Sequence, residues 1–139
     1  MTAIQTNVRI LIVEPEPQTA AELQTLLHHQ GYESVVVQTA HDALIHLYSE
    51  SFNIALINLW LLDMTGIDLL RKIKNLPDEI AVFLMGVQIT PAIILEAINS
   101  GAVELLYKPF VAVSLIPKIE FLLNHNLPIE QNPTEKKSA

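Results

Sequence analysis

Several residue types are absent or scarce in this chain. It has no cysteine, four glycines and only eight Lys and Arg among its 139 residues, against fifteen Asp and Glu. The absence of cysteine excludes a disulfide framework and thiol chemistry, and it makes a cytoplasmic location the expectation. The formal net charge of −7 argues against non-specific nucleic-acid binding, which needs a basic surface.

Long apolar runs are also missing. Half of the residues are hydrophobic, yet no apolar run reaches the ~18 residues that a membrane span needs. Residues 1–10 (MTAIQTNVRI) lack the basic and apolar regions of a secretory signal. We therefore expect no membrane association and one domain at residues 8–123. The tail at 1–7 and the polar tail at 124–139, which we expect to be disordered, leave no room for an output domain.

Two kinds of apolar segment alternate along the chain. Short β-branched runs predict strands, and apolar residues at spacings of three and four predict helices. Gly31 is placed to end the first helix, and Thr90 with Pro91 to begin the fourth. Pro117 is tolerable only if the last helix begins at Ser114. The strands are expected at 8–13, 32–37, 54–58, 80–85 and 103–107, and the helices at 19–30, 40–49, 66–73, 91–100 and 114–123.

This alternation predicts an α/β fold with a single parallel sheet and helices on both faces. Such sheets bind ligands and carry out chemistry at the carboxyl ends of their strands. The side chains to consider are therefore those that end the predicted strands. They are Glu14, Pro15, Asn58, Gly86 and Lys108.

Three segments together resemble the receiver domain of two-component response regulators, over about residues 8–123. They are the acidic turn at 13–17 (VEPEP), Asn58 with Gly66 eight residues later, and residues 100–110 (SGAVELLYKPF). The last segment has the family's residues at the family's spacing and is the specific signal. The resemblance implies a flavodoxin-like fold, with strand order 2-1-3-4-5, and a role in phosphorelay signalling.

The resemblance also implies a set of functional groups. In the family an aspartate takes the phosphoryl group, two acids after the first strand hold Mg²⁺, and a lysine stabilises the anion. A hydroxyl after the fourth strand and an aromatic ring on the fifth then switch conformation. This chain matches the pattern at one acid, Glu14, and at the lysine, Lys108.

The other positions of that set are replaced. Asn58 stands at the nucleophile position and Pro15 at the second acid, while Gly86 stands at the hydroxyl position and Leu105 at the aromatic switch. Together these losses remove the nucleophile, a metal ligand and the switch. The sequence thus predicts a pseudo-receiver that is not an enzyme and has no catalytic residue, metal or cofactor.

We expect the remaining charges of the pocket to neutralise one another. Without a metal, Lys108 and Glu14 would pair, and Asn58 would bridge them by donating to Glu14 and accepting from Lys108. The alternative is a small anion held by Lys108. Two carboxylates near the third strand, Asp63 and Asp68, are expected to be solvated and not to replace the nucleophile.

Other residues indicate possible contacts. Trp60 either contacts a partner or covers the pocket, and the five histidines show no metal-ligand spacing. The last two helices carry more apolar residues than packing on a sheet requires, which indicates an interaction face or only the Ile and Leu content of such proteins. The residues expected on this face are Ile93, Ile94, Val113, Ile116 and Phe121.

The primary hypothesis is a stand-alone, non-phosphorylatable receiver-like module that acts by contact with a signalling protein, or as a homodimer through the last two helices. One alternative is an active response regulator that is phosphorylated at another residue. The other is a flavodoxin-like protein that binds a small ligand, although Glu14-Pro15 and the residues after them offer no phosphate loop.

Overall fold

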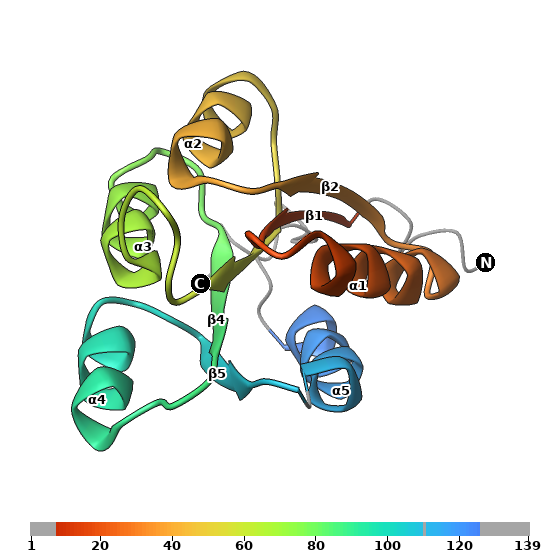
Figure 1. Cartoon of the computed structure of the whole chain (residues 1–139). Helices are drawn as coiled ribbons and strands as arrows, with labels where there is room; N and C mark the ends of the chain where they lie inside the picture. Colours follow the sequence, from red (N-terminus) through yellow and green to blue (C-terminus); the bar gives the residue numbers. More distant parts are fainter. Residues whose placement is uncertain (1–7, 110, 126–139) are drawn as a thin grey trace.

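Strands and helices alternate along the described chain. The computed structural model describes residues 8–109 and 111–125 (Figure 1). The strands are β1 (Arg9–Val13), β2 (Glu33–Val37), β3 (Ile54–Asn58), β4 (Ala81–Gly86) and β5 (Glu104–Tyr107). The helices are α1 (Pro17–His29), α2 (Ala40–Ser49), α3 (Gly66–Lys74), α4 (Pro91–Asn99) and α5 (Val111–Asn124). The predicted alternation is confirmed.

The strands form one parallel sheet in the order β2-β1-β3-β4-β5. Every residue of β3 and β4 is buried, which is expected of central strands that are covered on both faces. The two edge strands, β2 and β5, contain exposed and half-buried residues. The predicted fold class and strand order are both confirmed.

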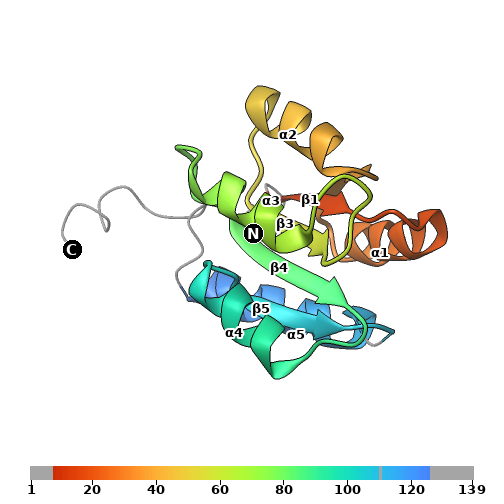
Figure 2. The same ribbon diagram turned by 60° about the vertical axis from the view of Figure 1, so that its left-hand side comes forward.

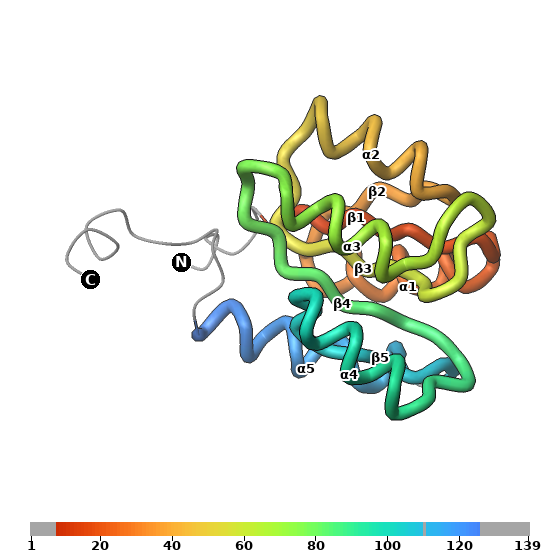
Figure 3. Tube along the Cα trace, turned by 90° about the vertical axis from the view of Figure 1, so that its left-hand side faces the viewer, coloured from red at the N-terminus to blue at the C-terminus, as the bar shows by residue number. Residues whose placement is uncertain are grey.

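The helices lie on both faces of the sheet. Helices α2, α3 and α4 cover one face, and α1 and α5 cover the other (Figures 1 and 2). In the view onto the first face, α3 and α4 lie in front of the sheet (Figure 3). The right-handed crossovers between parallel strands produce this distribution. No described helix has the length and apolarity to cross a bilayer.

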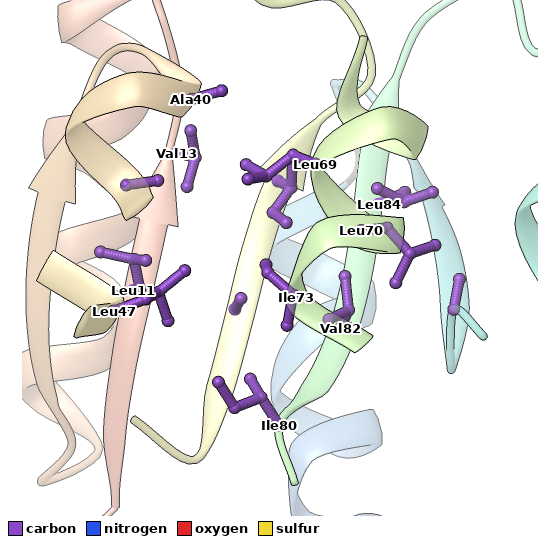
Figure 4. Packing of buried hydrophobic residues seen from close by; sticks show 14 of the residues in the cluster. Leu11, Val13, Ala40, Leu47, Leu69, Leu70, Ile73, Ile80, Val82 and Leu84 are labelled. Carbon is purple, nitrogen blue, oxygen red and sulfur yellow. The ribbon is translucent and has the colours of Figure 1, made fainter. Parts of the chain in front are cut away.

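Alternate residues of each central strand belong to different cores. Leu11 and Val13 of β1, with Val82 and Leu84 of β4, pack against α2 and α3 (Figure 4). The residues between them point to α1 and α5, because successive side chains of a strand face opposite sides. The large, fully buried side chains of this second core include Ile10, Ile12, Leu27, Ile54, Leu56 and Phe83.

Most predicted helix ends are correct. Gly31 follows α1 with φ +87°, a conformation that glycine adopts without strain. Thr90 caps α4 by accepting a hydrogen bond from the Ile93 amide at 3.2 Å, and Pro91 follows it. Helix α1 begins two residues earlier than expected, at Pro17, where a proline fits the first turn.

The predicted start of the last helix is wrong. Helix α5 begins at Val111 and contains Pro117 in its interior. Proline removes the hydrogen bond to the carbonyl four residues earlier, that of Val113. Both residues are exposed, so water can satisfy this carbonyl on the outer side of the helix. The predicted tail at 1–7 lies outside the described residues, and of the predicted tail at 124–139 only Asn124, the last residue of α5, and His125 are described.

Candidate functional site

The carboxyl ends of β1, β3, β4 and β5 meet at one edge of the sheet. Backbone hydrogen bonds continue past the strands, from Leu59 N to Met85 O at 2.8 Å and from Lys108 N to Gly86 O at 2.9 Å. Glu14, directly after β1, lies at the same edge because β1 is paired with β3. The parallel sheet therefore brings together the residues that sequence reasoning selected.

Glu14 and Lys108 form a buried ion pair across this edge. Lys108 Nζ lies 2.7 Å from Glu14 Oε1, and the two side chains are 19% and 1% exposed. The other oxygen, Glu14 Oε2, accepts a hydrogen bond from the Glu16 amide at 3.1 Å. Within the described chain Oε1 has no partner of hydrogen-bond geometry, so only the ammonium charge stabilises it. The expected pairing of the two residues is present.

Asn58 does not bridge that pair as the sequence suggested. Its Nδ2 donates a hydrogen bond to the backbone oxygen of Trp60 at 2.8 Å, and the residue is 8% exposed. A carboxylate cannot donate this bond and would repel the carbonyl oxygen. The amide therefore binds the loop that follows β3, a contact for which there is no signal in the amino-acid sequence.

The positions of Pro15 and Gly86 carry no side-chain oxygen. A Cβ built on Gly86 would lie 2.9 Å from Leu59 Cδ1, so the Leu59 side chain fills the space that a larger residue at 86 would need. Leu105 is half-buried and packs against the core under α2, α3 and α4. A hydroxyl or an aromatic ring at these two positions would therefore require repacking.

The donor set does not fit Mg²⁺, the metal that the resemblance implies. Mg²⁺ requires several oxygen ligands in octahedral geometry. Of the pocket residues, Glu14 is occupied by the ammonium of Lys108, and Pro15 supplies no side-chain oxygen. The described residues also contain no group of three or more His, Asp and Glu side chains that is placed to hold a metal ion.

Comparison with known proteins agrees with this architecture. The model of the response regulator receiver domain matches residues 10–120. The chain belongs to the response regulator receiver family. It is 30% identical over 122 residues to the transcriptional regulatory protein ZraR of Salmonella typhimurium. The aligned residues cover 88% of this chain but only 28% of ZraR.

Solved receiver domains have the same fold. One is a CheY-like receiver domain from Methanospirillum hungatei, with a TM-score of 0.79 and 29% identity, over 84% of this chain and 94% of that one. The receiver domain of a histidine kinase from Syntrophus aciditrophicus gives a TM-score of 0.78 and 27% identity, over 90% and 96% of the two chains.

In this receiver domain the loop after β3 is connected to α2. Asp63 Oδ1 accepts a hydrogen bond from the Ala40 amide at 3.0 Å, and Oδ2 accepts one from the His41 amide at 2.9 Å. Partial burial opposes ionisation of Asp63, but these hydrogen bonds outweigh it and lower the pKa of the carboxyl. Asp63 is exposed in the loop, as expected, but sequence reasoning missed its two hydrogen bonds to α2, because they join segments more than twenty residues apart.

The other candidate carboxylate lies at the surface of the receiver domain. Asp68 is exposed on α3, and Arg71 NH1 lies 3.3 Å from its Oδ1. Trp60 is 49% exposed, and its backbone pairs with Thr65 across the loop. The contacts found for the two carboxylates are thus with the amides of α2 for Asp63 and with Arg71 for Asp68.

The expected interaction face is only partly exposed. Val113 and Phe121 on α5 are 76% and 60% exposed, and the Phe121 ring stacks on His125 at 4.0 Å. Ile93 and Ile116 are half-buried and pack against the two cores. Ile94 is also half-buried. Sequence reasoning missed two exposed residues of α4, Leu95 and Ile98.

Proposed function

We propose that this receiver domain is a non-phosphorylatable pseudo-receiver. It acts by protein–protein contact in a two-component or phosphorelay-type pathway, without the phosphoryl transfer that the family resemblance implies. The observation that carries the proposal is the state of the pocket: Lys108 and Glu14 neutralise each other, and Asn58 binds its own loop. None of these three groups is arranged to attack a phosphoryl donor.

The proposal is supported by the absence of a suitable carboxylate among the pocket residues. A neutral amide is a poor nucleophile, and one acid in an ion pair is a poor metal site. The main alternative, phosphorylation at another residue, would need Asp63 or Asp68 to act in its place. Asp63 is bound to α2 by two hydrogen bonds, and Asp68 lies on the exposed surface of α3 beside Arg71.

The test is incubation of the full chain with Mg²⁺ and acetyl phosphate, followed by intact-mass spectrometry. We expect no phosphorylated species, either in the native protein or in an Asn58→Asp variant, because Pro15 and Gly86 still leave the site incomplete. A phosphate adduct of any kind on the native chain would overturn the proposal, and peptide mapping would then identify the residue.

The contact surface is proposed to include the exposed apolar residues of α4 and α5. Four large apolar side chains on these helices are between 47% and 76% exposed: Leu95, Ile98, Val113 and Phe121. Several exposed apolar side chains on two helices favour a contact surface, whereas a single one would need no explanation. The partner is a signalling protein or a second copy. Val113→Glu should abolish capture of the partner or dimerisation. Lys108→Ala should weaken either interaction only in proportion to the fraction of the chain that it unfolds.

The remaining expectations about the whole protein stay predictions. These are its stand-alone arrangement, its cytoplasmic location and the absence of nucleic-acid binding. The relative ZraR is named as a transcriptional regulatory protein, and this chain spans 28% of its length. A small anion or a flavin-like ligand has no support in the pocket, since Lys108 is already paired with Glu14.

A further inference from the structure

Strand β2 forms an edge of the sheet and is paired on one side only, with β1. Glu33 N donates to Val8 O at 3.2 Å, and Val37 O accepts from Glu14 N at 3.0 Å. In a parallel ladder, every second residue of a strand uses both its N–H and its C=O to bond the same neighbouring strand. The residues in between direct their N–H and C=O away from that neighbour, here toward the open edge. The outward-facing residues are Ser34, Val36 and Gln38.

This outer edge is almost unprotected. Within the described chain one hydrogen bond covers it, from Gln24 Nε2 to Ser34 O at 3.2 Å. Edge strands are usually blocked by lysine, proline or a bulge. Strand β2 (ESVVV) contains neither lysine nor proline, and it pairs with β1 residue by residue, without a bulge. The N–H and C=O of Val36 are thus available to a further strand.

A groove lies beside the open edge, on the face of the sheet that α2 covers. Its volume is about 480 Å³, and it is lined by Val36, Val37, Gln38, Asp42, Ile45 and His46. Ile45 is 53% exposed and Tyr48, one turn further along α2, is 74% exposed. A strand added to β2 would bury apolar side chains of one face against Val37 and Ile45.

The charges around the groove indicate a basic occupant. Asp42 lines the groove after β2 ends, and the Glu33 side chain, 64% exposed, lies at the other end of the edge. Arg9, 3.3 Å from Glu33, is also shared with Glu50 and so only partly neutralises this acidic end. A cation at each end of an added strand would meet a carboxylate.

A second copy of the chain fits less well. An antiparallel pair of β2 strands centred on Val36 would place Glu33 of one copy opposite Thr39 of the other. The hydroxyl of Thr39 caps α2 by accepting a hydrogen bond from the Asp42 amide, so Asp42 lies close to Thr39. The carboxylate of Glu33 in one copy would therefore approach that of Asp42 in the other. Each copy also carries a net charge of −7. Like charges oppose this dimer.

We infer that the outer edge of β2 and its groove form a strand-addition site for an extended segment of another protein, with alternating apolar residues between basic ends. The main-chain groups of Val36 supply the pairing, Ile45 and Val37 the apolar contact, and Asp42 the charge. This site uses neither side chain of the Glu14–Lys108 pair and does not depend on the chemistry of that pocket, so the two proposals can fail separately.

The probe is a fluorescein-labelled peptide, Lys-Val-Thr-Val-Thr-Val-Lys, titrated with the full chain and followed by fluorescence anisotropy. We expect saturable binding that falls by about fivefold or more when alternate peptide amides are N-methylated, since each lost hydrogen bond costs about that factor. Replacing both terminal Lys by Glu should weaken binding further, and the difference should shrink in high salt.

Variants of the chain locate the binding. Val36→Pro removes an outward N–H without breaking the bonds to β1, and Ile45→Ser removes the apolar contact. Each should weaken peptide binding about fivefold or more. The matched control is Val87→Ser in the loop after β4, which removes an apolar side chain of similar exposure, 49% against 53%, and should leave binding unchanged. Urea midpoints are to be measured for all three variants, so that a loss of binding can be distinguished from a loss of folding.

Three results would overturn the inference. They are no saturable binding of the peptide, equal binding of the N-methylated peptide, and a loss with Val87→Ser as large as that with Ile45→Ser. Sedimentation equilibrium provides a further test: a dimer of the native chain that Val36→Pro abolishes would show that a second copy occupies the edge, against the charge argument.

Discussion

The Glu14–Lys108 pair gives the most informative single substitution. Lys108→Met keeps a flexible side chain of similar length but removes the charge that lies 2.7 Å from Glu14 Oε1. At that distance the attraction is about 6 kcal/mol for an effective dielectric constant of ~20, and it is largely offset by desolvation of both ions. Removing one partner leaves the desolvation cost of the Glu14 carboxylate, which is only 1% exposed. We therefore expect a loss of about 3–5 kcal/mol in the free energy of unfolding.

The assay is urea unfolding followed by circular dichroism. For a slope of about 2 kcal/mol per M, that loss lowers the midpoint by about 1.5–2.5 M. The double variant Glu14→Gln with Lys108→Met should recover most of it, because Gln carries no charge and its side-chain oxygen can still accept from the Glu16 amide.

The matched control for this experiment is Lys118→Met. Lys118 forms a pair of similar length with Glu104, at 2.9 Å, but its side chain is 38% exposed, so a loss of about 0–1 kcal/mol is expected. If Lys108→Met lowers the urea midpoint no more than Lys118→Met does, the idea that Lys108 serves to neutralise a buried carboxylate is refuted.

Three further predictions concern stability. Gly86→Thr should lower the free energy of unfolding by about 1–3 kcal/mol, because the Cβ of Thr would collide with the Leu59 side chain. In a Leu59→Ala background the same substitution should lower it by less, and an unchanged loss would refute the packing argument. Gly66→Ala should cost about 1–3 kcal/mol, since its Cβ would collide with the backbone oxygen of Asn58; a normal urea midpoint would contradict this. Asp63→Ala should cost about 1–2 kcal/mol at pH 7. The hydrogen bonds lower the pKa of Asp63 in the folded state, so this stabilisation is complete above the ordinary value of about 3.9 and disappears as pH falls through the lower folded value. A difference from the native chain that persists unchanged at pH 2 would contradict the assignment.

The fold was largely predictable because its strands and helices have strong local patterns. The fully buried β3 and β4 read as continuous apolar runs, and Gly31 and Thr90 are local signals for helix ends. The site was also predictable, since a parallel sheet brings the carboxyl ends of its strands to one edge. Glu14 and Lys108 followed from that rule alone.

The contacts that were not predictable depend on side-chain geometry or on distant segments. Asn58 has several polar neighbours, and only the three-dimensional path of the loop decides that it donates to Trp60. Asp63 caps a helix that begins 23 residues earlier in the chain. Pro117 is tolerated inside α5 because it lies on the exposed side of that helix. Which side of a helix a residue occupies cannot be predicted from the type of that residue alone.

The most direct test of the central claim is an NMR titration of the ¹⁵N-labelled chain with beryllofluoride in the presence of Mg²⁺. Beryllofluoride imitates a phosphoryl group on an aspartate, so it requires both a carboxylate and a metal site. We expect that the amide signals of Asn58, Gly86 and Lys108 do not shift at any concentration. Saturable shifts of these three signals, with accompanying changes in α4 and α5, would contradict it.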